Sequence, residues 1–283
     1  MSDVMSIVDQ RLRETGSTRP IALFRIAIAS LAMMRFGPEM SLHLAESFPD
    51  ILLRLAFFLF TTLAALGAWT RVSLTGLAAV LGYMYFVGGF IEDRPGWGHH
   101  HHYMLFASTV LLAMSPCDRS FSIDRAFAIR KAEQSGSSLP LEVGPTWVQT
   151  LLVLQMAALY FWTAIDKTNA AFLRGDRLER IFEWVYVGTP LYDVLTQRWF
   201  LAGGSIFVVL IEYVLPFMLI FRWRLPWAYA IAFALHAGFY VMLPVQTYSA
   251  TMLAMYILVA HPDSVHAALD RYVFGKTGHV QTA

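Results

Sequence analysis

A lysine that follows a run of aromatic residues is the feature of this sequence best suited to proton transfer. Residues 160–169 read YFWTAIDKTN, so an apolar helix would end at Lys167. Tyr160 and Thr163 precede Lys167 by two turns and one turn, which places the three side chains on one helix face. A lysine in a partly desolvated pocket has a lowered pKa and can act as a general base. The other interpretation is a lysine whose charged end extends to the membrane surface.

Four consecutive histidines, His99–His102, form the densest polar cluster of the chain. One interpretation is a metal site, because His99 and His102 would share a helix face. The remaining ligands would have to come from Glu92, Asp93 or His236. We expect no metal, because adjacent histidines project in different directions and the nine histidines do not form the spaced boxes of di-iron membrane desaturases. A haem between His236 and one of the four histidines is a further alternative.

The composition points to an integral membrane protein. Hydrophobic residues make up 57% of the 283 residues and charged residues 14%, whereas soluble domains carry about 25% charged residues. Lys and Arg number 21 against 20 Asp and Glu, and this net charge of +1 excludes binding to nucleic acid by bulk charge. The lone cysteine, Cys117, excludes an internal disulfide framework.

The apolar stretches predict an all-α, polytopic membrane protein with about eight transmembrane helices. A spanning helix needs about 20 mostly apolar residues, and these stretches are apolar all round, unlike barrel strands. The eight stretches are 20–38, 51–69, 72–91, 101–115, 147–165, 200–221, 226–243 and 247–261. We therefore expect a lead-in over 1–19, one transmembrane domain over 20–262 and a polar tail over 263–283.

The distribution of Lys and Arg among the loops predicts the orientation of the chain. The loops on the side of the two termini carry more of these residues than the opposite loops, which favours termini in the cytoplasm. His99–His102 and Lys167 then lie on the non-cytoplasmic side. The simplest location is a bacterial-type inner membrane, with the lipid bilayer as the first partner.

Three ionisable residues occur inside the expected spans, where such groups are functional candidates by default. Arg25 lies early in the first span, Glu212 in the middle of the sixth and His236 in the middle of the seventh. An ion pair between Arg25 and Glu212 would remove much of the insertion cost of both, so we expect a structural ion pair there. For His236, a hydrogen bond between helices is the simplest interpretation.

Five motifs in a fixed order carry a resemblance to a known family. They are LFRI at 23–26, LGAWTR at 66–71, a histidine–tyrosine pair followed by SPCDRSFSID at 115–124, the segment 155–169, and Glu212 and Pro216 with His236. The sequence resembles the horizontally transferred transmembrane domain (HTTM) family, the membrane core of vitamin K-dependent gamma-glutamyl carboxylases. The resemblance covers about residues 19–262, and the motif at 115–124 is its most specific part.

The resemblance implies a function and a set of site residues. In the carboxylases, a lysine deprotonates reduced vitamin K, whose anion reacts with oxygen to give a base strong enough to remove a glutamate gamma-proton before carbon dioxide adds. By register that lysine is Lys167, and the family's histidine is His101. The quinone-binding residues are then Tyr103, Tyr160, Trp162, Thr163 and His236. Asp166 stands where the family has a second lysine, which alters the basicity of Lys167.

Two classes of function follow from these features. The first is a carboxylase-like enzyme that binds a reduced quinone of the vitamin K or menaquinol type and uses O2, with or without CO2, on a peptide or small-molecule substrate. Because the chain stops shortly after its last expected span, we expect no propeptide-directed carboxylation. The second is a non-catalytic membrane protein that keeps the fold, such as a transporter, an immunity protein or a partner subunit.

Overall fold

The computed structural model describes residues 2–94, 96–98, 100–243 and 245–275. Helices form nearly all of its regular structure, which confirms the predicted all-α class. The earlier helices are α1 (Ser2–Arg13), α2 (Arg19–Phe36), α3 (Phe48–Leu66), α4 (Thr70–Gly82), α5 (His100–Ala113) and α6 (Ile123–Ser135). The later helices are α7 (Trp147–Lys167), α8 (Ala170–Leu173), α9 (Asp176–Tyr186), α10 (Tyr192–Leu195), α11 (Arg198–Ile220), α12 (Leu225–Met242), α13 (Gln246–Met255) and α14 (Pro262–Tyr272).

Several short elements connect these helices. The strands are β1 (Thr15–Ser17) and β2 (Val143–Pro145), which pair in antiparallel register with Gly16 opposite Gly144. The 3-10 turns are η1 (Leu42–Leu44), η3 (Cys117–Arg119) and η4 (Tyr256–Leu258), and η2 (Tyr83–Gly88) is a π-helix that continues α4.

The chain divides into two compact units, each of which has its own packing. The first unit contains residues 1–152 and 254–283, and the second contains residues 153–253. Helix α7 begins in the first unit and ends in the second.

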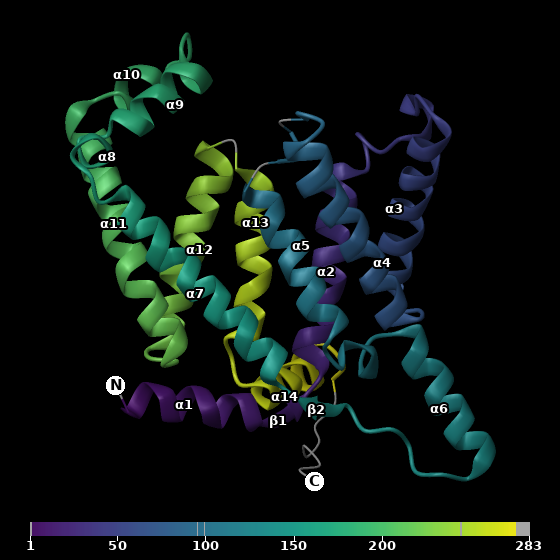
Figure 1. The fold of residues 1–283 in the computed structure, drawn as a ribbon. Helices are drawn as coiled ribbons and strands as arrows, with labels where there is room; N and C mark the ends of the chain where they lie inside the picture. The colour runs from purple at the N-terminus through teal and green to yellow at the C-terminus, as the bar shows by residue number, and fades with distance from the viewer. Residues whose placement is uncertain (1, 95, 99, 244, 276–283) are drawn as a thin grey trace. The chain divides into compact units, whose positions relative to one another are not determined.

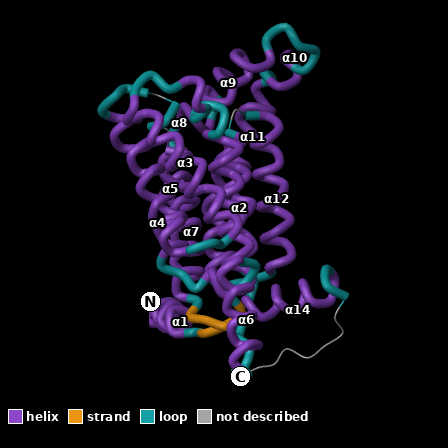
Figure 2. Tube along the Cα trace, turned by 90° about the vertical axis from the view of Figure 1, so that its right-hand side faces the viewer, coloured by secondary structure: helices purple, strands orange, loops and turns teal. Residues whose placement is uncertain are grey.

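The first unit is built around α2, which contacts α3, α5, η3, η4 and α14. Its apolar side chains Phe24, Ile28, Ala32 and Phe36 are fully or almost fully buried among these neighbours. Helices α3, α4 and α5 also pack on one another in sequence order. The β1–β2 pair joins the start of α2 to the segment before α7, and the strands are visible in orange in Figure 2.

The second unit contains α11 and α12 packed together, with α8, α9 and α10 gathered near the start of α11 (Figure 1). A small apolar cluster of Phe182, Leu195 and Leu201 holds these short helices to α11. Tyr160, Lys167, Glu212 and His236 lie in this unit.

The helices support a multi-pass membrane protein, and the expected count of eight spans is only approximate. Within the described residues, five helices are long and apolar enough to cross a membrane: Phe48–Leu66, Thr70–Gly88, Trp147–Lys167, Arg198–Ile220 and Leu225–Met242. A sixth span is possible if Gln246–Leu258 and Pro262–Tyr272, which meet at 96°, act as one broken span.

The other expected spans fail this test for two physical reasons. Helix α2 holds three arginines, Arg19, Arg25 and Arg35, within 18 residues. The fourth expected span forms an apolar helix only over His102–Ala113, which is too short to cross a bilayer in a straight path. The number of spans read from hydrophobicity alone is therefore approximate.

Candidate functional site

An ion pair between Lys167 and Glu212 is the central feature of the second unit. Nζ of Lys167, at the end of α7, donates to Oε1 of Glu212 in α11 over 2.5 Å. The side chain of Glu212 is 2% exposed and that of Lys167 is 23% exposed. Lys167 therefore directs its charge to a buried carboxylate, which argues against the interpretation of a lysine that reaches for the membrane surface.

The second oxygen of the Glu212 carboxylate lacks a hydrogen-bond donor among the described residues. Oε2 of Glu212 is buried and accepts no hydrogen bond within the described part of the chain. The side chain of Thr163 lies within hydrogen-bonding reach of Glu212, and its hydroxyl donates to the carbonyl of Tyr160 over 3.0 Å. Burying an acceptor without a partner costs on the order of 1–3 kcal/mol, so Oε2 is a natural acceptor for a hydroxyl group of a ligand.

A second buried contact joins α7 to α12. The hydroxyl of Tyr160 forms a hydrogen bond with Nε2 of His236, and both side chains are fully buried. The ring of His236 also packs against Phe239 and Tyr248 at centroid distances of 5.8 and 5.7 Å. The expected hydrogen bond between helices at His236 is thus present.

The face of α7 that carries Tyr160, Thr163 and Lys167 agrees with the spacing of these residues in the sequence. Tyr160 and Lys167 are two helical turns apart, or about 10 Å along the axis. Trp162 lies on another side of the helix and is 66% exposed. The structure therefore brings four of the predicted residues, Lys167, Tyr160, Thr163 and His236, together with Glu212, and it leaves Trp162 outside this group.

The end of α7 is fixed by polar contacts around Lys167. Thr168 and Tyr213 share a hydrogen bond of 3.0 Å between their hydroxyls, and Asn169 caps α8 by accepting from the backbone N–H of Phe172. Asp166 is exposed. The partner that controls the charge of Lys167 is therefore Glu212 in α11, and the neighbouring Asp166 points elsewhere.

The structure replaces the predicted Arg25–Glu212 ion pair with two other arrangements. Glu212 pairs with Lys167. Arg25 is fully buried and donates to the carbonyl of Cys117 over 2.8 Å and to that of Phe121 over 2.5 Å. The sequence shows that opposite charges occur within the expected spans. It cannot show which backbone carbonyls an arginine contacts, because every residue has one.

The most specific motif, at 115–124, forms a junction in the first unit. Asp124 accepts from the backbone N–H groups of Trp69 and Thr70 and from the Thr70 hydroxyl, over 2.7–2.8 Å, and so caps α4. Ser122 caps α6 by accepting from the N–H of Arg125. Burial raises the pKa of Cys117 to about 11, so this thiol stays protonated at neutral pH and is no nucleophile.

The remaining predicted residues belong to the first unit. Tyr103 is 43% exposed, and its ring lies 5.7 Å from that of Tyr85. His102 is buried and its Nε2 accepts from Nε of Arg35 over 3.1 Å. His101 lies in α5, but its side chain, like all of His99, is outside the described residues. No group of three or more His, Cys, Asp or Glu side chains arranged for a metal occurs among the described residues.

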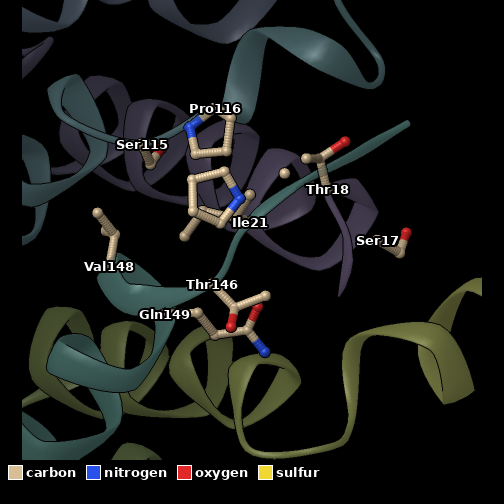
Figure 3. Close-up of a pocket in the computed structure, with 10 residues that line it drawn as sticks. Ser17, Thr18, Ile21, Ser115, Pro116, Thr146, Val148 and Gln149 are labelled. Carbon is tan, nitrogen blue, oxygen red and sulfur yellow. The ribbon is translucent and has the colours of Figure 1, made fainter. Parts of the chain in front are cut away.

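A small pocket of mixed polar and apolar lining is also present in the first unit (Figure 3). Its wall includes Ser17, Thr18, Ser115, Thr146 and Gln149. The pocket has room for about one water molecule, so it cannot hold a quinone ring.

A comparison with known protein families matches most of the chain to one family. The model of the HTTM domain matches residues 17–263. The chain belongs to the HTTM domain family. This is a carboxylase-related family of membrane proteins, and the predicted resemblance is confirmed over most of the chain. No curated protein and no solved structure matches the sequence.

In this HTTM protein, the sequence missed the role of Glu212. The available signal was that Lys167 directly follows the expected span 147–165 and that Glu212, of opposite charge, lies within the expected span 200–221. The predicted pairing of Glu212 with Arg25 rested on their opposite charges alone, because the sequence does not show which helices are neighbours.

Proposed function

We propose that this protein is a carboxylase-related membrane enzyme that binds a reduced quinone and removes a proton from it with the Lys167–Glu212 pair. The observation that carries the proposal is this ion pair, in which Glu212 is almost fully buried. We place the protein in a bacterial-type inner membrane with both termini in the cytoplasm, as the loop charges favour. His101 is proposed as the second catalytic residue from the family register alone.

The leftover oxygen of the carboxylate supports the fit of a quinol at this place. A quinol hydroxyl that donates to Oε2 of Glu212 would satisfy the buried acceptor. Tyr160 and His236 are already bonded to each other and fully buried. They would therefore support the wall of the site, whereas Glu212 and Lys167 would meet the hydroxyl.

The pair can accept one proton without help from water. In its resting state Lys167 is positive and Glu212 negative, so the pair is neutral overall. When the quinol O–H bond breaks, the proton is held by Oε2 of Glu212, Lys167 keeps its positive charge, and the pair becomes positive. This charge stabilises the adjacent anion, and such stabilisation is strong in a site of low dielectric constant. A bound quinol would supply the group that reacts with O2 and is itself oxidised, with or without carboxylation of a second substrate.

A second candidate function is a non-catalytic membrane protein that keeps the fold. The same ion pair favours it, because a partly exposed lysine that neutralises a buried glutamate also reduces the cost of the glutamate charge in a membrane. The Lys167–Glu212 contact would then serve the packing of α7 and α11 alone.

The experiment is anaerobic binding of menaquinol to the full chain in lipid nanodiscs, followed by admission of O2. We expect O2-dependent conversion of menaquinol to its epoxide and water in the wild type. The conversion should be lost in Lys167→Ala, and Glu212→Gln should reduce it by about 100-fold or more, in the range typical of acid–base residues. His101→Ala tests the residue taken from the register.

Asp166→Asn is the matched control, since it removes a charge next to Lys167 from an exposed side chain. We expect it to keep the conversion. Tight quinol binding with no turnover in any variant or in the wild type would establish the non-catalytic candidate instead.

A further inference from the structure

The segment that connects α7 to α11 joins the ends of two candidate membrane spans. Helix α7 ends at Lys167 and α11 begins at Arg198, and both qualify as membrane spans. The segment 168–197, which contains α8, α9 and α10, therefore lies where these two spans leave the bilayer. Figure 1 shows the three short helices together at that end of α11.

The packing within the second unit fixes which face of α9 is turned inward. Leu178, Ile181 and Phe182 pack against Leu195 and Leu201. These α9 residues are spaced three and four apart, as expected for one face of a helix. The opposite face of α9 is consequently available to solvent or lipid.

The outward face carries two arginines and a tryptophan. Arg177, Arg180 and Trp184 follow one another at intervals of three and four residues, so they lie along one line of the helix. All three are exposed, and Trp184 is 74% exposed. We call these three residues the α9 stripe. A second exposed tryptophan, Trp199 at 70%, begins α11. Tryptophan is enriched at both interfaces of a membrane, where its ring meets the headgroups.

Acidic residues lie close in sequence to the arginines of the α9 stripe. Glu179 pairs with Arg198 over 3.1 Å and Asp176 with Arg174 over 3.0 Å. Arg180 donates to the backbone carbonyl of Asp176. Within the described part of the chain, neither Arg177 nor Arg180 forms an ion pair. Asp176 and Glu179 are thus engaged by other arginines, and Glu183 of the same helix is exposed. The guanidinium groups of Arg177 and Arg180 remain for an external anion.

We propose that the α9 stripe binds the headgroup of an anionic phospholipid. Guanidinium groups bind phosphate oxygens through paired hydrogen bonds, and the Trp184 indole beside them fits the boundary between headgroups and acyl chains. The place of the segment at the ends of two spans puts both arginines at headgroup depth. This binding site is independent of the proposed quinol chemistry, because it uses neither Lys167 nor Glu212.

The test is a lipid titration of the purified full chain in neutral detergent. Phosphatidylglycerol and phosphatidylcholine with identical acyl chains are added in parallel, and bound lipid is counted by native mass spectrometry. The wild type should prefer phosphatidylglycerol, and added NaCl should weaken this preference. The double variant Arg177→Gln/Arg180→Gln should bind phosphatidylglycerol about 30-fold more weakly, from the usual contribution of two basic residues at an anionic membrane surface. Its affinity for phosphatidylcholine should stay unchanged.

Arg130→Gln/Lys131→Gln is the matched control, because it removes the same two charges from α6 in the other unit. We expect it to keep the wild-type affinity for phosphatidylglycerol. Gel filtration and circular dichroism check that each variant is folded, which exposed side chains should allow. Equal binding of both lipids by the wild type would overturn the proposal. An unchanged phosphatidylglycerol affinity in the Arg177/Arg180 variant, or an equal loss in the control, would overturn it as well.

Discussion

Lys167 is the last residue of α7, yet its ammonium contacts a carboxylate well inside α11. Glu212 follows the start of α11 at Arg198 by about 21 Å along the helix axis. The sequence predicted the face of α7 that carries Lys167 correctly, since that depends only on helical spacing. The partner of Lys167 depends on which helices meet, and this information is absent from the spacing.

A single and a double variant test the Lys167–Glu212 contact at the same scale. Lys167→Met leaves a buried carboxylate without its counter-charge and should lower the free energy of unfolding by on the order of 3 kcal/mol. Lys167→Met/Glu212→Leu removes both charges and should recover most of that loss. The measurement is the thermal unfolding of the full chain in lipid nanodiscs. Asp166→Asn serves as the control on the same helix and should change little. A double variant that is less stable than Lys167→Met would show that the buried carboxylate of Glu212 does not depend on the charge of Lys167.

At the scale of elements, the turn between α3 and α4 shows how a motif positions a helix. Gly67 ends α3 in the left-handed conformation with φ of 66°, and a Cβ atom there would lie 2.5 Å from Nη1 of Arg25. The arginine in turn holds the carbonyls of Cys117 and Phe121. The sequence motifs at 23–26, 66–71 and 115–124 therefore meet at one junction.

Gly67→Ala tests this junction. The substitution should destabilise the protein through two effects, the left-handed backbone and the clash with Arg25. Gly136→Ala is a matched control, because Gly136 ends α6 with φ of 65° and a Cβ atom there meets open space. We expect Gly136→Ala to cost about 1 kcal/mol from the backbone alone and Gly67→Ala to cost clearly more. Thermal unfolding of both variants provides the comparison, and equal losses would exclude a contribution from the clash.

At the scale of the whole chain, the first unit joins residues from its beginning, middle and end. Arg19 pairs with Glu142 over 2.7 Å and with Asp270 over 2.6 Å. Burial lowers the pKa of Arg19, but the two carboxylates outweigh this effect and hold it above its usual value. His266 adds a 3.2 Å contact to Asp270. These links hold α14 to the start of α2.

Asp270→Asn should loosen α14, because the substitution removes the negative charge that faces Arg19 and His266. We expect faster amide hydrogen exchange over Pro262–Tyr272, while exchange in α11 and α12 stays at the wild-type rate. Arg271→Gln changes an exposed charge on the next residue and should leave α14 protected. Faster exchange in both variants would show that α14 responds to any charge change in its last turn.

The sequence by itself determined the helical class, the membrane character and the HTTM family. Composition, long apolar stretches and ordered motifs are local properties, and each is visible without knowledge of neighbours. The sequence also placed Tyr160, Thr163 and Lys167 on one face. Only the tertiary structure decided that Lys167 pairs with Glu212 and that Arg25 holds two carbonyls. It also decided that Phe24, Ile28 and Phe36 of α2 lie in the core of the first unit. These outcomes depend on contacts between segments that are distant in the sequence. A buried polar group needs a partner, and the hydrophobic pattern does not specify which residue supplies it.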